Sequence, residues 1–189
     1  VRNTPRPLKD RDMSQYIRNY QKGGSYFFTL VLENRVNNTI LIDNIELIRN
    51  AFKSVKRKYK FIIDAVVIMP DHIHLLITLA ARSFDYTNIV RTFKAYISKR
   101  LPCEEYISEV RRKRNERGIW QRRFWEHTIR DQNDFNHHVD YIHWNPVKHG
   151  YVKNVKDWPY SSFHKYVEKG IYPENWCASE IIMRSELSE

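Results

Sequence analysis

The sequence predicts a single α+β domain. Four segments of strand length are rich in β-branched and aromatic residues, and three longer segments repeat apolar residues at helical spacing. The chain has 189 residues, of which 42% are hydrophobic and 14% aromatic. This is enough material for one well-buried core, and too little for two.

Residues 1–15 are expected to form a basic arm outside the folded core. Four Lys or Arg residues and two prolines stand in this segment, a composition that neither builds a helix nor buries much surface. Arg6 and Arg11 are candidates for contact with a nucleic-acid backbone, and a solvated tail is the alternative.

A strand and a helix follow the arm. Residues 25–32 combine aromatic and β-branched side chains, as strands do. Asp43 is placed to cap a helix that runs to about Lys58, with Ile45 and Ile48 at helical spacing and basic residues at its end.

The segments 61–69 and 72–79 are expected to form two buried strands that meet at a Pro-Asp corner. His72 and His74 interrupt the second apolar run, and side chains at i and i+2 of a strand project from the same face. They can therefore form half of a divalent metal site, with a third ligand supplied from elsewhere in the chain. A hydrogen-bonded histidine pair without a metal is the alternative.

The next segments combine a helix with an exposed stretch. Asp85 is expected to begin a helix that reaches Leu101, with apolar residues on one side and basic residues around the rest. Residues 102–118 are dominated by charge, so we expect a solvated insertion or an exposed helix there.

Residues 119–129 are predicted to be a fourth strand or extended segment. Its aromatic residues alternate with Arg122 and Arg123, and Trp125 follows them. Arginines next to aromatic residues suit pairing with phosphates and stacking on unpaired bases. A half-exposed strand without a ligand is the alternative.

The last long helix is predicted over 131–149, with aspartates near its start and Gly150 just past its end. Tyr141 and Asn145 are four positions apart and so share one face. A tyrosine hydroxyl can attack a phosphodiester, and an amide oxygen one turn away can complete a metal site that two histidines begin. A tyrosine that only packs is the alternative. Pro146 is expected to end or bend this helix.

Charge and cysteine content indicate the partner and the compartment. The net charge is +10, with 32 Lys and Arg against 22 Asp and Glu, which favours a polyanion such as nucleic acid. A membrane surface is the weaker alternative, because the basic residues are scattered and no apolar run approaches the length of a spanning helix. Only two cysteines occur, and no apolar signal region stands at the N-terminus, so we expect a cytoplasmic protein.

The sequence resembles the single-tyrosine transposases of the histidine-hydrophobic-histidine superfamily, and most closely the REP-associated tyrosine transposases of bacteria. Four blocks carry the resemblance, in the order 69–76 (MPDHIHLL), 120–127 (WQRRFWEH), 138–150 (HVDYIHWNPVKHG) and 157–164 (DWPYSSFH). It covers about residues 16–176.

The resemblance implies a ferredoxin-like antiparallel sheet with helices packed on one face. Residues 16–150 would form the catalytic domain, with 102–118 inserted in it, and 151–189 would be a C-terminal tail. The implied reaction is site-specific cleavage and rejoining of single-stranded DNA at REP-like hairpins, in the cytoplasm of a bacterium. A monomer is slightly favoured over an oligomer.

The resemblance also assigns roles to single residues. Tyr141 matches the nucleophile that forms a 5'-phosphotyrosine, and His72, His74 and Asn145 match the ligands of a Mg or Mn ion. Lys148 joins the expected DNA contacts. The basic arm and the 102–118 segment have no clear place in the family's pattern.

The sequence also offers other assignments. Tyr96 is the other candidate nucleophile, but Arg100 stands four positions after it, where an amide ligand would be needed, so Tyr96 is interpreted as a packing residue. A DNA-binding module without chemistry would use the same basic surface. A zinc hydrolase or structural zinc protein is disfavoured, because no nearby cysteine pair or HExxH helix completes a site with the histidines.

Overall fold

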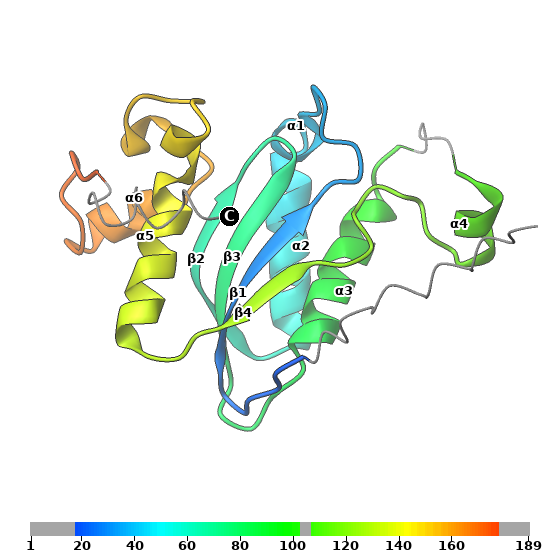
Figure 1. The fold of residues 1–189 in the computed structure, drawn as a ribbon, viewed down its shortest axis with the longest axis horizontal. Coiled ribbons are helices and arrows are strands. Elements are labelled where there is room, and N and C mark those ends of the chain that lie inside the picture. Colours follow the sequence, from blue (N-terminus) through cyan, green and yellow to red (C-terminus); the bar gives the residue numbers. More distant parts are fainter. Residues whose placement is uncertain (1–17, 103–106, 178–189) are drawn as a thin grey trace, which may run out of the picture.

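The computed structural model describes residues 18–102 and 107–177. Its centre is a four-stranded antiparallel sheet in the order β2-β3-β1-β4 (Figure 1). The strands are β1 (Ser25–Val31), β2 (Phe61–Ile68), β3 (His72–Leu79) and β4 (Trp125–Thr128). The prediction of an α+β fold with an antiparallel sheet is confirmed.

Helices cover both faces of this sheet (Figure 1). They are α1 (Ile40–Asp43), α2 (Ile45–Lys58), α3 (Tyr86–Ser98), α4 (Glu109–Lys113), α5 (Gln132–Lys148) and α6 (Phe163–Glu168), with a short 3₁₀ helix η1 (Val155–Asp157). The expectation of helices on one face holds for α2 and α3, whereas α5 packs on the opposite face. A second helical layer is possible because the central strands carry apolar side chains on both faces.

The alternation along β3 separates the two layers of core. Ile73, Leu75 and Ile77 pack with the side chains of α2 and α3, whereas Leu76 packs with those of α5. His72 and His74 have the same parity as Leu76, so both imidazoles lie on the α5 face.

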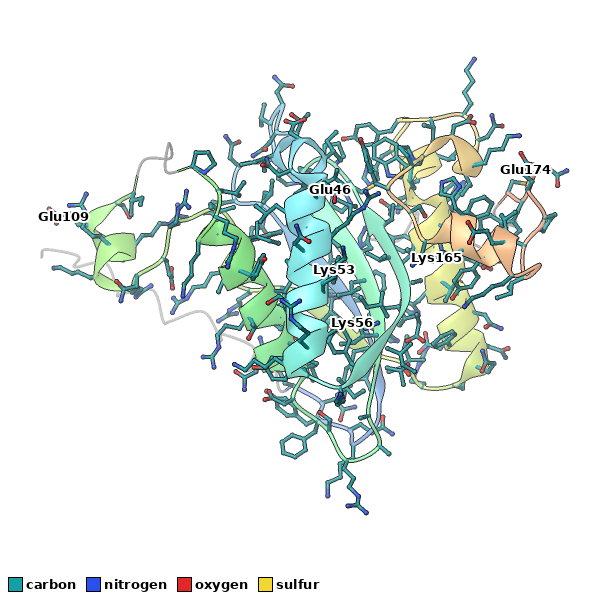
Figure 2. All side chains as sticks on the ribbon, turned by 180° about the vertical axis from the view of Figure 1, so that it is seen from behind. Glu46, Lys53, Lys56, Glu109, Lys165 and Glu174 are labelled. Atoms are coloured by element: carbon teal, nitrogen blue, oxygen red, sulfur yellow. The ribbon has the colours of Figure 1, made fainter. Side chains whose placement is uncertain are left out.

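The start of α2 differs from the prediction. Asp43 is the last residue of α1, and its carboxylate accepts a hydrogen bond from Thr39 Oγ1 at 2.6 Å. Asn44 precedes α2 without a side-chain capping bond. Lys53 and Lys56 project from the outer side of α2, away from the sheet (Figure 2).

The predicted cap of α3 is confirmed, because the Asp85 side chain accepts from the amide of Asn88 at 3.2 Å. The helix ends at Ser98, three residues before the predicted end at Leu101. Within the segment 102–118, the described residues contain α4, which buries none of its side chains, as expected for an exposed helix.

The fourth strand is shorter than predicted, for a reason visible in its pairing with β1. Trp120 forms a β-bridge with Leu32, and Trp125 pairs with Thr29. The chain therefore advances five residues from Trp120 to Trp125, whereas the segment it pairs with advances only three, from Thr29 to Leu32. The extra residues leave the sheet, and Arg122 and Arg123 are exposed there.

Both ends of α5 match the sequence. Asp131 caps its start by accepting from the amide of Asp134 at 2.9 Å. At its end the amide of Gly150 donates to the carbonyl of Val147 at 2.9 Å, and the amide of Tyr151 donates to the carbonyl of Pro146 at 3.0 Å. These two bonds form a Schellman motif, in which Gly150 has φ +71°. The helix continues through Pro146 to Lys148, so Pro146 does not end it, and a bend at Pro146 stays a prediction.

The described part of 151–189 packs onto the domain. Trp158 Nε1 donates to the carbonyl of Ile68 at 3.1 Å, and the Tyr166 hydroxyl donates to that of Asp64 at 3.0 Å. These bonds fix the segment after α5 against β2. Over residues 18–102 and 107–177, no helix has the length and apolar character needed to cross a membrane.

Candidate active site between the sheet and helix α5

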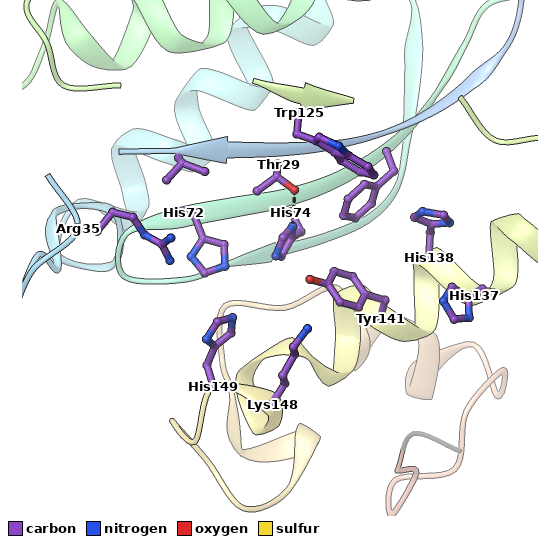
Figure 3. Close-up of a pocket in the computed structure, with 12 residues that line it drawn as sticks. Thr29, Arg35, His72, His74, Trp125, His137, His138, Tyr141, Lys148 and His149 are labelled. Atoms are coloured by element: carbon purple, nitrogen blue, oxygen red, sulfur yellow. Dashed lines mark hydrogen bonds between the residues drawn. The ribbon is translucent and has the colours of Figure 1, made fainter. Parts of the chain in front are cut away.

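A cavity of about 580 Å³ lies between the sheet and α5 (Figure 3). Its walls come from β1, β3, β4 and α5, with Arg35 from the loop after β1 and His149 from the end of α5. The lining residues are Phe27, Thr29, Val31, Arg35, His72, His74, Trp125, His137, His138, Tyr141, Lys148 and His149. Five residues that the sequence singled out therefore share one cavity: His72, His74, Trp125, Tyr141 and Lys148.

His72 and His74 lie side by side, as their spacing predicts. Their ring centroids are 4.8 Å apart, with the ring planes at 78°. Each residue is only 4% exposed. The two imidazoles therefore form a compact and largely buried pair.

The orientation of His72 is fixed by Asp71. His72 Nδ1 lies 2.6 Å from Asp71 Oδ1, and since a carboxylate only accepts, Nδ1 carries the hydrogen, which leaves Nε2 as the lone-pair nitrogen of the neutral ring. Arg35 Nε donates to the other carboxylate oxygen at 2.6 Å. Burial by itself would raise the pKa of Asp71, but the hydrogen bonds from His72 and Arg35 outweigh it and hold this pKa well below its ordinary value. Asp71 is thus a carboxylate that orients the imidazole.

Thr29 holds His74 from the neighbouring strand. His74 Nδ1 lies 3.0 Å from Thr29 Oγ1, which can accept from the imidazole (Figure 3). Burial, and then the nearby His72, lower the pKa of His74 well below its ordinary value. The ring is therefore neutral at pH 7, the form in which histidine binds a metal.

Tyr141 faces this pair from α5. Its ring centroid lies 5.2 Å from that of His74, and its hydroxyl points toward the two histidines (Figure 3). Lys148 Nζ lies 4.9 Å from the centroid of the Tyr141 ring. A cation at this distance stabilises negative charge on the phenol oxygen relative to the neutral hydroxyl.

Asn145 is fully buried on α5, one turn after Tyr141 and one turn before His149, and it is not among the cavity-lining residues. Within the described residues, neither Asn145 Oδ1 nor Nδ2 has a hydrogen-bond partner. The ring of His149 lies 5.3 Å from that of His72, just as the ring of Tyr141 lies near His74. Since residues at i−4 and i+4 both face the histidine pair, helical spacing predicts the same direction for the Asn145 side chain.

The other predicted residues lie elsewhere. Arg122 and Arg123 are exposed and do not line the cavity, and Arg6 and Arg11 fall outside the described residues. Tyr96 packs with the core under α2 and α3, on the opposite face of the sheet from the histidines. This agrees with its interpretation as a packing residue.

Several residues of the candidate site were missed by sequence reasoning. Asp71 precedes the histidine pair, so a search for a carboxylate partner of His72 could have found it. His149 continues the helical stripe of Tyr141 and Asn145, and the same spacing could have indicated it. Thr29 gave no signal, because its place beside His74 depends on the pairing of β1 with β3.

A second cluster of polar side chains includes His138, which lines the cavity at the end away from Arg35 and His149 (Figure 3). His127, Asp134 and His138 offer three possible ligand atoms within 4.8 Å of one another, and within the described residues this is the only such trio of His, Cys, Asp or Glu. Asp134 Oδ2 lies 2.8 Å from His127 Nε2, and Asp134 Oδ1 lies 3.1 Å from His138 Nδ1. The hydrogen bonds from His127 Nε2 to the Asp134 carboxylate and from His138 Nδ1 to the Asp134 main-chain carbonyl, each at 2.8 Å, therefore account for their approach.

Comparison with known protein families is informative. The family model described as transposase IS200-like matches residues 22–145. The chain is 50% identical over 165 residues to a protein of Haemophilus influenzae that carries the provisional name REP-associated tyrosine transposase, covering 87% of this chain and 93% of that protein. It is 42% identical over 164 residues to the REP-associated tyrosine transposase of Escherichia coli, covering 87% and 91%.

A solved structure is similar over most of the chain. A REP-associated tyrosine transposase bound to a REP hairpin superposes with a TM-score of 0.76 and is 41% identical, covering 88% of this chain and 93% of that one. The fold described above is therefore the fold of that protein.

Proposed function

The chain belongs to the IS200-like transposases, and among them to the REP-associated tyrosine transposases, which cleave and rejoin DNA; from this membership we propose that it acts on single-stranded DNA that contains REP-like hairpins. The proposed reaction is metal-dependent and site-specific, and it passes through a 5'-phosphotyrosine. The observation that carries the proposal is the position of Tyr141, which faces the oriented pair His72 and His74 across one cavity.

Tyr141 is the proposed nucleophile. The Tyr141 hydroxyl would lose its proton, and its oxygen would bond to the scissile phosphorus as the bond from phosphorus to the 3' oxygen breaks. The 3' oxygen would take up one proton in turn and leave as a free 3'-hydroxyl. The phosphate would stay on the tyrosine, so the reverse attack by a 3'-hydroxyl would rejoin the strand without another source of energy. Lys148, near the ring, would favour the charged form of the phenol oxygen during attack.

The side chains present fit a divalent ion. His72 and His74 can each offer an Nε2 lone pair, and Asn145 offers a buried amide oxygen that lacks a partner within the described residues. Mn and Mg are the candidate ions, and Mn is favoured because imidazole is a softer ligand than the carboxylates that Mg usually prefers. When bound, such an ion would polarise the scissile phosphate and offset its developing charge.

The DNA contacts are proposed from charge and position. Lys148 and Trp125 line the cavity, where the scissile strand would lie, whereas Arg122 and Arg123 are exposed beside β4 and could reach phosphates outside it. Arg6 and Arg11 stay candidates for backbone contacts from the N-terminal arm. The net charge of +10 favours the same polyanionic partner, which a bacterial protein would meet in the cytoplasm.

The two alternative functions differ in what they require of the cavity. A DNA-binding module needs the basic surface only, and gives no reason for a tyrosine to face two oriented histidines. A zinc site needs a further strong ligand, and the only ligand trio within the described residues does not include His72 or His74.

The experiment that tests the proposal is incubation of the purified chain with end-labelled hairpin DNA carrying a single-stranded foot, with and without manganese. We expect a covalent adduct between protein and DNA on a denaturing gel, formed only with the ion. Release of DNA fragments without an adduct would instead indicate a nuclease that uses water.

A further inference from the structure

The rings of His138, His127 and Trp125 form a column. Two of them, His138 and Trp125, line the cavity at the end opposite to Arg35 and His149 (Figure 3). The His127 ring stacks on that of His138, with centroids 4.6 Å apart and planes at 15°. The His127 ring is also parallel to the Trp125 ring, with centroids 6.0 Å apart and planes at 8°. The column therefore runs from α5 to the edge strand β4 and ends in an indole.

Asp134 clamps two of these rings. Its carboxylate accepts from His127 Nε2 at 2.8 Å, and its carbonyl accepts from His138 Nδ1 at 2.8 Å. Asp134 is held in turn by the amide of Arg130, which donates to Oδ2 at 2.9 Å. Both imidazoles are thus fixed before any ligand arrives.

The outer end of the column is open. Trp125 is 50% exposed, although its ring is parallel to that of His127 and contacts the Phe27 ring edge-on at 5.6 Å. An indole held on one side with half of its surface in solvent is a platform for another flat ring. Inside the cavity, the Nε2 edge of His138 is an acceptor, since its Nδ1 carries the hydrogen given to Asp134.

The two ends of the cavity differ in chemistry. Arg35 and His149 stand at one end, Trp125 and His138 stand at the other, and the Tyr141 hydroxyl and Lys148 lie between them (Figure 3). A strand whose phosphate lies at Tyr141 would place an adjoining nucleotide at the aromatic end.

We propose that the column of His138, His127 and Trp125 is a preorganised subsite that stacks an unpaired nucleobase next to the scissile phosphate. Trp125 supplies the contact, and Asp134, His127 and His138 are positioning residues. The inference rests on the proposed function, since it takes the scissile phosphate to lie at Tyr141.

The subsite is tested by binding in a protein that cannot react. In a Tyr141→Phe background, Trp125→Ala, Trp125→Phe and Phe84→Ala would be compared by fluorescence anisotropy with a labelled hairpin that carries a single-stranded foot. Phe84 is the matched control, because it is a 52% exposed aromatic residue that does not line the cavity. An abasic nucleotide would then be moved through the foot, one position at a time.

We expect Trp125→Ala to weaken binding by roughly tenfold, Trp125→Phe to keep most of it, and Phe84→Ala to leave it unchanged. At one position of the foot, an abasic nucleotide should weaken binding by the parent protein as much as Trp125→Ala does. The same abasic nucleotide should not weaken binding by Trp125→Ala any further. Asp134→Asn should weaken binding in part, and only with DNA that has a base at that position.

The subsite would be overturned if Trp125→Ala bound the DNA as tightly as its parent. It would also be overturned if every abasic position weakened DNA binding by Trp125→Ala further. The proposed function is judged separately, by whether the protein with Tyr141 forms the covalent adduct. An adduct without dependence on Trp125 refutes the subsite alone, and Trp125-dependent binding without an adduct refutes the chemistry alone.

Discussion

The Tyr141 ring lies 5.2 Å from the His74 ring at an interplanar angle of 69°, although one residue is on α5 and the other on β3. This contact joins the two halves of the candidate site across the α5 layer of the core. It exists because α5 packs on the face of the sheet from which the histidine pair projects. A tyrosine on α2 or α3, such as Tyr96, cannot reach that pair through the sheet.

Asp71→Asn should raise the manganese requirement of the reaction. The change keeps the size of the side chain and removes the charge that orients His72. Loss of such an orienting partner typically weakens metal binding by roughly 10- to 100-fold. We expect adduct formation to need correspondingly more manganese, with the rate largely recovered at saturation. Asp43→Asn is the control, because this carboxylate is exposed on α1, and equal manganese requirements for the two variants would contradict the role of Asp71.

Lys148→Met should slow adduct formation by roughly tenfold, because it removes the cation that lies 4.9 Å from the Tyr141 ring. Lys148→Arg keeps a cation and should retain most of the rate. Single-turnover rates at saturating DNA separate this effect from weaker binding. Lys153→Met, on the exposed turn after α5, is the control. Unchanged rates in Lys148→Met would remove Lys148 from the chemistry.

Asp134→Asn should lower the free energy of unfolding near neutral pH. The decrease should become smaller as the pH falls. Burial would raise the pKa of Asp134, but the hydrogen bonds led by the one from His127 lower it to about 2. The ordinary value is about 3.9, so the contribution is complete above that pH and is lost as the pH falls toward 2. Urea unfolding should show a gap from wild type on the order of 1 to 2 kcal/mol at pH 6 that narrows below pH 4.

The control for this series is Glu168→Gln, which changes an exposed carboxyl to an amide on α6. It should show little gap at any pH. A gap for Asp134→Asn that stays constant from pH 6 to pH 3 would mean that the carboxylate charge does not stabilise the fold.

Binding of hairpin DNA should weaken steeply with salt, because each phosphate neutralised by the +10 chain releases a counterion. We expect affinity to fall by at least roughly tenfold between about 50 and 200 mM salt. A hairpin with an unpaired foot should bind more tightly than a perfect duplex at every salt concentration. Affinity that stays flat over this range would contradict the electrostatic argument.

The parts of the site that lie within one element were predictable from spacing. The pair His72 and His74 follows from the two-residue repeat of a strand, and the pair Tyr141 and Asn145 from the turn of a helix. The caps Asp85 and Asp131 followed from local hydrogen-bonding chemistry, and both are present.

Contacts between elements were not predictable from spacing. Thr29 meets His74, and Trp125 enters the cavity, only because of the registers of β3 and β4 with β1. The side of the sheet that α5 covers depends on how the chain crosses after β4, for which the sequence carried no local signal. Asp43 and Asn44 show the same limit on a smaller scale, because either could cap a helix and the tertiary packing divides the segment into α1 and α2.

The central claim is that the Tyr141 oxygen attacks the DNA. Wild type, Tyr141→Phe and Tyr96→Phe would be incubated with manganese and end-labelled hairpin DNA, and the covalent adduct measured on a denaturing gel. Phenylalanine keeps the ring that packs near Phe27 and His74, so the fold and DNA binding should persist while the adduct disappears. Tyr96→Phe should form the adduct as wild type does. An adduct that survives in Tyr141→Phe and is lost in Tyr96→Phe would contradict the account and move the nucleophile to α3.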